Sequence, residues 1–373
     1  GSGRTPAMAA LRGESLDFAK CHAHAPWTTP SHMSMLTGLY PNQHGRNIKF
    51  NIMTQTNYDR VPHFRTIADV LSASGFETAA FTGNGSISAR YGLGQGFQLY
   101  NESRKDEDNS DLPATMAAFE KWLKNRDVSR PLFLFFHTYD FHNPMALHPP
   151  PNMYSPIMDN KTLTRFGPYM FLRNNFLEAF NDIEILREDD PSHDLPCLEY
   201  IDGHLARFFQ LLKNHGLYDS SLIFFTGDHG SRMKFTEDKC CYHGSGQYEE
   251  NLAVPLTLRL PGASGKGNAV PGLARHIDIY PTVLGSFDLE SDHYPGTGTS
   301  LLARFRDGDA AVPAVSFSCA EAYTHRRFSL LNARYKYIYT PDDNFNFIVR
   351  QYIDSGRLER MNSCSEEIGR AHV

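Results

Sequence analysis

The sequence predicts an α/β fold with a mostly parallel central sheet that is flanked by helices. Short apolar runs alternate with longer segments of helical periodicity, and Gly, Pro or polar residues separate the two kinds of segment. Strands separated by helices are typical of a parallel sheet with helices on both faces. The chain has 373 residues, of which 41% are hydrophobic, so it is long enough to bury a substantial core.

Several short apolar runs are predicted to be buried strands of this sheet. Each run is rich in β-branched or aromatic residues and is bounded by residues that favour turns. In chain order, these runs are Thr78–Thr82, Pro131–His137, Ser221–Thr226 and Val254–Leu260.

Helices are predicted between these strands. The strongest pattern covers residues 196–215, where apolar residues recur at helical spacing and Gly216 provides a stop. The segments Arg65–Ser74 and Leu112–Lys124 have the same periodicity, and Pro113 suits the first turn of the second segment. These helices supply the two outer layers of the predicted fold.

The pattern changes after about residue 310. Closely spaced strand-like runs without intervening helices predict a small antiparallel sheet, formed by Val315–Ser318, Arg327–Leu331 and Tyr335–Thr340. We therefore expect a large α/β domain over 4–310, a small antiparallel subdomain over 311–345 and a tail over 346–373, whose last residues read as artefactual. The stretch 143–195, rich in Pro, Asn and Asp, is predicted to be a long insertion.

Composition excludes some classes of function. The formal net charge is -6, which offers no basic surface for nucleic acid. No apolar run approaches the roughly 20 residues that span a bilayer, so we expect no membrane segment in this chain. The six cysteines are scattered without a metal-type CxxC pair, and they leave the redox compartment open.

The segment Thr28-Thr29-Pro30-Ser31-His32 has the composition of a helix start. A hydroxyl at a helix N-terminus lies beside backbone N–H groups that favour an anion. Such a hydroxyl is a weak nucleophile until a metal or a base lowers its pKa. The alternative interpretation is an ordinary capped helix at the surface.

Polar side chains also follow two of the predicted strands. Asp228 and His229 come directly after the run Ser221–Thr226, and Asp140 and His142 follow the run Pro131–His137. Open α/β sheets place ligands at the carboxyl ends of their strands, and carboxylate and imidazole are common metal ligands. By itself, Asp-His-Gly is also a common turn sequence.

Together these segments resemble the sulfatase family, a branch of the alkaline-phosphatase superfamily. The family pattern of Cys or Ser, any residue, Pro, Ser, Arg and a later Thr-Gly is similar to the segment from Thr28 to Gly38. Thr28 takes the nucleophile position, and His32 stands in place of the Arg. The Asp-His-Gly segment and the stretch that begins at His243 are similar to later family regions in the same order, so that the resemblance extends from about residue 5 to 340.

The resemblance implies a sandwich fold of alkaline-phosphatase type and a metal-dependent ester hydrolase. It places Asp228, His229 and Thr28 on a divalent cation. It makes Thr28 the nucleophile and His142 either a general acid or a ligand of the anionic group of the ester. It puts His243 on that anionic group, where a positive charge stabilises the transition state.

Other residues of the matching segments are expected around the substrate or behind the metal ligands. They are Ser31, His32, Asn84 and Asp140. His137 is expected either to orient one of these groups or to be a core residue.

Three departures from the family pattern matter. Sulfatases convert their Cys or Ser to formylglycine, which Thr28 cannot become; Thr28 is instead similar to the nucleophile of nucleotide pyrophosphatase-phosphodiesterases and phosphoethanolamine transferases. A family Lys that touches sulfate is absent beside Asn84. The family also begins with a strand that ends in Asp-Asp, which is missing before Arg4, so we expect the chain as given to be inactive by itself.

These observations leave several functions open. The first is hydrolysis of sulfuric esters, with calcium as the family's cation. The second is phosphodiester cleavage or phosphotransfer with Thr28 as covalent nucleophile, for which Zn²⁺ or Mn²⁺ suits the imidazole of His229 better. The third is an inactive relative that binds glycans. The expected partner is a small-molecule or glycan ester of sulfate or phosphate, and the compartment, secreted or lysosome-like, stays undetermined.

Overall fold

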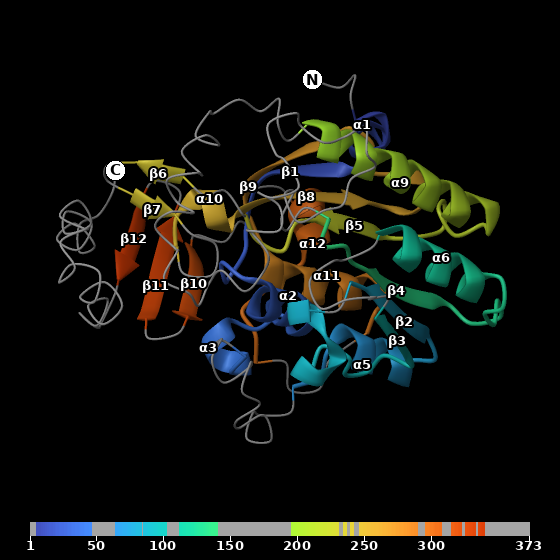
Figure 1. Ribbon diagram of the computed structural model, residues 1–373, viewed down its shortest axis with the longest axis horizontal. Helices are drawn as coiled ribbons and strands as arrows, with labels where there is room; N and C mark the ends of the chain where they lie inside the picture. The colour runs from blue at the N-terminus through green and yellow to red at the C-terminus, as the bar shows by residue number, and fades with distance from the viewer. Residues whose placement is uncertain are drawn as a thin grey trace, which may run out of the picture.

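The computed structural model describes residues 5–46, 64–83, 85–102, 112–140, 195–230, 234–236, 239–241, 246–289, 295–307, 315–322, 325–332 and 335–339 (Figure 1). The tail 346–373 and the predicted insertion, apart from its last residue, lie outside these ranges. In the described part of the chain, no helix has the length and apolar character needed to cross a membrane.

The strands of the large domain form two sheets. One has the order β5-β8-β1-β9, and the other has the order β3-β2-β4. The strands are β1 (Leu16–His22), β2 (Glu77–Thr82), β3 (Leu99–Glu102), β4 (Leu132–Phe136), β5 (Ile223–Thr226), β8 (Ala253–Arg259) and β9 (Ala269–Arg275). All the strands predicted for this domain are therefore found, with ends shifted by one or two residues.

The α/β class is confirmed, with one difference in strand direction. β3 and β4 run parallel to β2, and β9 runs parallel to β1, but β8 is antiparallel to both β1 and β5. Both neighbours of β8 therefore run in the same direction as each other. The first sheet is consequently mixed, while the second is parallel throughout.

The sequence analysis missed β1, although it lies inside the first sheet. A register irregularity between Phe18 and Cys21 interrupts its pairing with β8. Leu16 and Phe18 are buried, but Ala19 and Lys20 are both exposed. A bulge of this kind breaks the alternation of buried and exposed residues by which a strand is recognised.

The edge strand β9 was missed for a different reason. It contains Pro271 and Gly272, and Gly272 has a φ of +84°. Both residue types argue against a central strand but are tolerated at the edge of a sheet.

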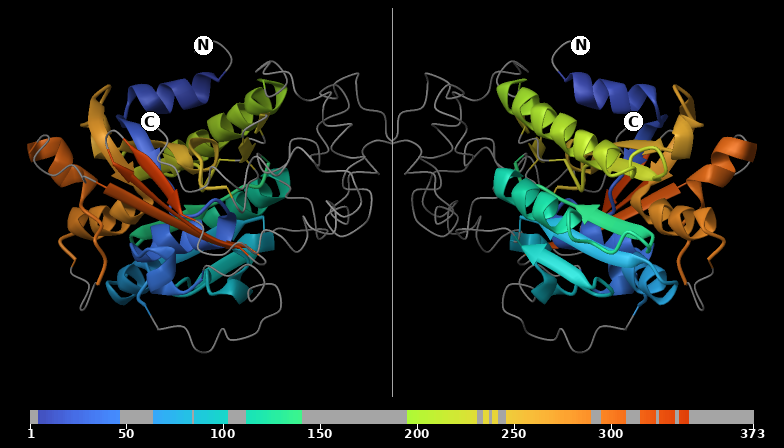
Figure 2. Two further views of the ribbon diagram at one scale, coloured as in Figure 1. Left: turned by 90° about the vertical axis from the view of Figure 1, so that its left-hand side faces the viewer. Right: turned by 90° about the vertical axis from the view of Figure 1, so that its right-hand side faces the viewer.

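Helices cover both faces of the strands, as Figures 1 and 2 show. On one face, α1, α6 and α9 pack against alternate residues of β2, β4 and β5. On the other face, α2, α5 and α11 pack against Phe133 of β4 and Phe224 of β5. The helices of the large domain are α1 (Pro6–Gly13), α2 (Thr28–Thr37), α3 (Pro41–His44), α5 (Ile67–Ala73), α6 (Leu112–Leu123), α9 (Leu195–Asn214), α10 (Glu249–Leu252), α11 (Ile279–Ser286) and α12 (Leu301–Asp307).

The alternation along β4 and β5 shows how the two sheets continue into one layer. Leu132, Leu134 and Phe136 of β4 face the same hydrophobic cluster as Ile223 and Phe225 of β5. Both strands therefore present the same side to α6 and α9. Their carboxyl ends bring the residues that follow them to one edge of the molecule.

The predicted antiparallel sheet near the C-terminus is also found. It consists of β10 (Val315–Ala322), β11 (His325–Asn332) and β12 (Lys336–Tyr339), each antiparallel to the next. The backbone N–H of Cys319 donates to the carbonyl oxygen of His24 at 2.9 Å, so this sheet is attached to the segment that follows β1. A short hairpin of β6 (Lys234–Thr236) and β7 (Lys239–Cys241) is present as well.

Candidate active site

The candidate site lies where the carboxyl ends of β1, β4 and β5 meet the start of α2. The segment after β1 leads into α2 at Thr28, and the segments after β4 and β5 carry His137 and Asp228. Because these three strands end at the same edge, residues that are far apart in the sequence become neighbours.

Helix α2 presents Thr28 in its first turn. All ten residues of the helix are buried, and Thr28 is only 3% exposed. The helix ends at Gly38, which has a φ of +68° and a backbone N–H that donates to the carbonyl oxygen of Ser34. The helix is therefore buried, and the surface position assumed by the alternative interpretation of the Thr28 segment is wrong.

Asp228 and His229 occupy the turn after β5. Nδ1 of His229 lies 2.8 Å from the carbonyl oxygen of Gly230, which can only accept, so Nδ1 is the donor in this hydrogen bond. The other nitrogen, Nε2, lies 3.5 Å from Oγ1 of Thr28 and 3.4 Å from Oδ2 of Asp228. Atoms that share one small cation at about 2.1 Å are separated by roughly 3.4 Å. The separations from His229 to Thr28 and from His229 to Asp228 are thus suitable for a shared cation, although the group of possible ligands found in the described residues does not include His229.

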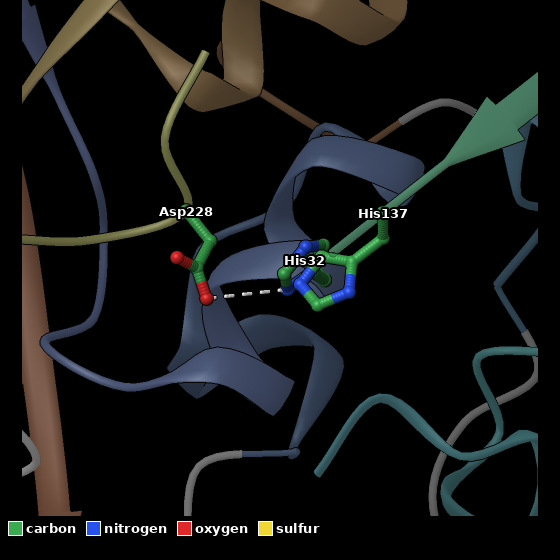
Figure 3. Close-up of side chains that lie close together, drawn as sticks. All are labelled: His32, His137 and Asp228. Atoms are coloured by element: carbon green, nitrogen blue, oxygen red, sulfur yellow. Dashed lines mark ion pairs between the residues drawn. The ribbon is translucent and has the colours of Figure 1, made fainter. Parts of the chain in front are cut away.

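His32 and His137 adjoin the same carboxylate (Figure 3). Nδ1 of His32 donates to the carbonyl oxygen of Thr28 at 2.9 Å and lies 3.6 Å from Oδ2 of Asp228. The rings of His32 and His137 meet edge to face, with centroids 5.0 Å apart. Among the described residues, His32, His137 and Asp228 each offer one ligand atom, and these atoms lie within 4.8 Å of one another.

The electrostatics of this cluster depend on burial and on the number of imidazoles. Burial lowers the pKa of His32, although the charge of Asp228 and the carbonyl of Thr28 act in the opposite direction. Burial acts to raise the pKa of Asp228, but the charges of His229, His32 and His137 outweigh it and bring the pKa below its ordinary value. Both directions favour the forms that bind a cation, because a metal needs an unprotonated imidazole nitrogen and an ionised carboxylate.

Ser31 and Tyr139 complete the surroundings of Thr28. The hydroxyl of Ser31 donates to the carbonyl oxygen of Asp228 at 2.5 Å. Burial raises the pKa of Tyr139, the charge of Asp228 raises it further, and a hydrogen bond with Thr28 opposes both. Tyr139 comes shortly after β4 in the sequence, but an aromatic residue there does not by itself predict a contact with Thr28.

Gly85 makes room for the ring of Tyr139. It has a φ of +64°, and a Cβ atom at this position would lie 3.3 Å from the Tyr139 ring. A larger residue would therefore be strained and would also press on this ring.

Some predicted site residues are not placed in the cluster. Asp140 is buried in the turn after β4, but the group of possible metal ligands found in the described residues contains His137 instead. Asn84, His142 and His243 lie outside the described residues.

The donor set fits a divalent cation. It combines imidazole nitrogens with a carboxylate oxygen, whereas Ca²⁺ takes oxygen ligands almost alone. The described residues therefore suit a cation that accepts nitrogen ligands.

Two curated proteins show different kinds of similarity to this chain. Lipoteichoic acid synthase 1 of Bacillus subtilis (strain 168) is 34% identical over 127 residues, which make up 31% of this chain and 19% of that protein. An ulvan-active sulfatase of Formosa agariphila is 20% identical over 375 residues, which make up 91% of this chain and 58% of that protein. The chain thus spans less than two thirds of the length of either relative.

Solved structures share the fold at low sequence identity. One of them is a protein that was solved in complex with its substrate, D-glucosamine-2-N,6-O-disulfate. It has a TM-score of 0.66 and 16% identity to this chain, and the match covers 97% of this chain and 93% of that protein's chain. The phosphonate monoester hydrolase of Agrobacterium radiobacter has a TM-score of 0.66 and 18% identity, and the match covers 96% of this chain and 91% of the hydrolase chain.

A family model described as Sulfatase matches residues 1–289, the part of the chain that contains Thr28, Asp228 and His229. Members of this family are ester hydrolases that generally use a divalent metal. Because the match covers most of the chain and includes the residues gathered at the carboxyl ends of the strands, this chain belongs to the sulfatase family.

Proposed function

We propose that this chain carries the active site of a metal-dependent hydrolase that acts on sulfuric esters, with Thr28 as nucleophile. One observation carries the proposal. Oγ1 of Thr28 lies 3.5 Å from Nε2 of His229, which in turn lies 3.4 Å from the carboxylate of Asp228, at the start of a buried helix. Membership of the sulfatase family supports the same reaction class.

Each residue has a proposed part in the reaction. Oγ1 of Thr28 loses its proton and forms a bond to sulfur as the bond from sulfur to the alcohol oxygen breaks. Water later attacks sulfur, sulfate leaves, and a proton returns to Oγ1 of Thr28. Asp228, His229, His32 and His137 would hold the cation. A bound cation lowers the pKa of the Thr28 hydroxyl and offsets negative charge on the ester.

Two further histidines have roles that follow from the family resemblance. We place His142 next to the alcohol oxygen, where an imidazolium donates the proton that the leaving group needs. We place His243 on the oxygens of the transferred group, where a positive charge stabilises the transition state.

The donor set leads us to propose Mn²⁺ or Zn²⁺ rather than Ca²⁺. Two imidazoles and one carboxylate lie within 4.8 Å of one another, and nitrogen donors suit borderline cations. The oxygen-rich set that calcium requires is not found among the described residues of the cluster.

The nucleophile is tested with a pair of substitutions at one position. Thr28→Val keeps the shape of the side chain but removes the hydroxyl, whereas Thr28→Ser keeps the hydroxyl. In the protein as its gene encodes it, we expect Thr28→Val to lower kcat for an aryl sulfate by more than about 1,000-fold and Thr28→Ser to lower it by less than about tenfold. Turnover that survives in Thr28→Val with folding intact would show that Thr28 is not the nucleophile.

A second candidate function is cleavage or transfer of a phosphoester through the same residue. Threonine cannot become formylglycine, and the chain is similar over 127 residues to a lipoteichoic acid synthase. Aryl sulfate and aryl phosphate should therefore be compared on one preparation. Mass spectrometry at a resolution that separates sulfate from phosphate then identifies the group carried by Thr28.

We propose a glycan as the alcohol part of the ester. A structural neighbour was solved with a disulfated glucosamine, and a curated relative is an ulvan-active sulfatase. A set of sulfated mono- and disaccharides tests this choice. Tight binding of these sugars without turnover, in protein that contains metal, would support the inactive glycan-binding alternative instead.

A further inference from the structure

His276 lies behind the candidate site without belonging to the predicted ligand set. It is fully buried at the start of a short 3-10 turn (His276–Asp278), between β9 and α11. Helix α2 packs against this turn. His276 therefore sits between the helix that carries Thr28 and the strand that leads to Asp228.

Both ring nitrogens of His276 face hydroxyl groups. Nδ1 lies 3.2 Å from Oγ of Ser31, which belongs to α2. Nε2 lies 3.3 Å from Oγ1 of Thr226, the last residue of β5. The ring thus spans the two elements that carry Thr28 and Asp228.

Each hydroxyl also contacts a backbone carbonyl. Ser31 donates to the carbonyl oxygen of Asp228 at 2.5 Å, and Oγ1 of Thr226 lies 2.7 Å from the carbonyl oxygen of Pro255. The contact from Ser31 reaches the backbone of Asp228 itself. A chain of hydrogen bonds therefore runs from His276 through Ser31 to Asp228.

The direction of these bonds follows from the number of protons. A hydroxyl has one proton, and Ser31 donates it to Asp228, so Nδ1 of His276 must be the donor toward Ser31. Burial lowers the pKa of His276 to about 3, so the ring is neutral near pH 7. In a neutral ring Nε2 then carries the lone pair, and the hydroxyl of Thr226 donates to Nε2 or to the carbonyl oxygen of Pro255 or Gly227.

We propose that His276 is a positioning residue, which fixes the backbone of Asp228 relative to the first turn of α2 through Ser31 and Thr226. This inference rests on the proposed function, because it assigns Asp228 to the cation site. Residues that orient metal ligands in this way change metal affinity by about 10- to 100-fold when they are replaced.

The tautomer is the first test, and it does not depend on metal binding. We expect ¹⁵N NMR of histidine-labelled protein near pH 7 to show a buried ring protonated at Nδ1 and bare at Nε2, and His276→Asn should remove this signal. A ring protonated at Nε2 would reverse the direction of the bond to Ser31 and overturn the proposal.

Metal affinity is the second test, measured by calorimetric titration of the protein as its gene encodes it with Mn²⁺ alone. In His276→Asn the side-chain amide keeps a donor near the position of Nδ1, whereas in His276→Gln it extends toward Thr226. We expect His276→Gln and His276→Leu to weaken Mn²⁺ binding by about 10- to 100-fold, and His276→Asn by less than about threefold.

His44→Leu is the matched control. His44 is also buried, and it contacts Ser34 at 3.1 Å in the second half of α2. We expect this variant to lower the unfolding temperature but to leave the Kd for Mn²⁺ within about threefold of the wild-type value. Equal weakening in His44→Leu, unchanged binding in His276→Gln and His276→Leu, or no Mn²⁺ binding by the wild type would each overturn the proposal.

The two proposals fail in different ways. If the wild type turns over ester and His276→Gln binds Mn²⁺ normally, the positioning role is wrong and the proposed function stands. If His276→Gln weakens Mn²⁺ binding but neither sulfate nor phosphate esters are cleaved, the positioning role stands and the proposed function is wrong.

Discussion

Two carboxylates on either side of His276, Asp228 and Asp278, have very different partners. Asp278 is completely buried and accepts hydrogen bonds from Arg275 at 2.8 Å, from Arg304 at 3.1 Å and from the backbone of Thr299 at 2.9 Å. The imidazoles around Asp228 stand at 3.4 and 3.6 Å.

The difference separates a structural carboxylate from one that we propose as a metal ligand. Arginines in direct contact compensate the charge of Asp278, so that it holds β9, α11 and α12 together. Around Asp228 the neighbouring nitrogens lie farther away, and Nε2 of His229, at 3.4 Å, stands at a separation that suits atoms around a shared cation. A carboxylate in direct contact with arginines therefore indicates a role in stability. A carboxylate whose neighbouring imidazole nitrogens lie beyond direct contact indicates a metal ligand.

The largest effect on Mn²⁺ binding is expected from Asp228→Asn. We expect this substitution to weaken Mn²⁺ binding by more than about 100-fold, because loss of a direct ligand exceeds loss of a residue that orients one. The free energy of unfolding without metal should change by less than about 1.5 kcal/mol, as for a typical substitution outside a paired network. Calorimetry with Mn²⁺ and urea unfolding measure the two quantities. Normal Mn²⁺ binding by the variant would remove Asp228 from the cation site.

Asp278→Asn is expected to lower the free energy of unfolding strongly and to leave Mn²⁺ binding nearly unchanged. The charges of Arg275 and Arg304 would remain buried without their carboxylate, and breaking such a pair costs about 3–5 kcal/mol of unfolding free energy. Urea unfolding measures this loss, and any residual folded protein should bind Mn²⁺ with nearly unchanged affinity. A loss below about 1 kcal/mol would contradict the structural role of Asp278.

Glu249 is expected to make an intermediate contribution to stability, and this contribution depends on pH. It lies 2.7 Å from Nε2 of His22 and 2.6 Å from Nζ of Lys336. Burial opposes ionisation, but these partners outweigh it and lower the pKa of Glu249 to about 2. Because the folded-state pKa is lowered, the stabilisation is present above about pH 4.5 and is lost as the pH falls toward 2.

The test compares Glu249→Gln with the wild type across this range of pH. The side chain is half exposed, so solvent screening limits the effect to about 1 kcal/mol. We expect the wild type to be more stable by about that amount near pH 6, with the difference shrinking toward pH 2 in thermal unfolding. A difference that grows as the pH falls would contradict the assigned direction.

The smallest effect is expected at the exposed pair of Arg12 and Asp17. The two groups are 2.5 Å apart, but the side chain of Arg12 is 68% exposed. Exposed ion pairs gain little because water and salt screen them. Arg12→Ala should therefore change the free energy of unfolding by less than about 0.5 kcal/mol, in contrast to Asp278→Asn. A loss above about 1 kcal/mol in urea unfolding would show that proximity, rather than burial, decides these roles.

The sequence by itself determined the α/β class, most strands, and the segments around Thr28 and Asp228. These features depend on local periodicity and on short runs of residues, which a single sequence displays. The bulge in β1 and the Pro and Gly of β9 hid two strands, because both features break the local pattern of a strand.

Only the tertiary structure decided which distant residues join the site. His137 reaches Asp228 and Tyr139 reaches Thr28 because β4 ends at the same edge as β5, and His276 reaches Ser31 because the turn before α11 packs against α2. No local pattern marks such residues, since their neighbours come from other strands and helices. The sequence therefore predicted the groups that we propose to carry the chemistry, while the packing of strand ends against α2 determines which groups surround them.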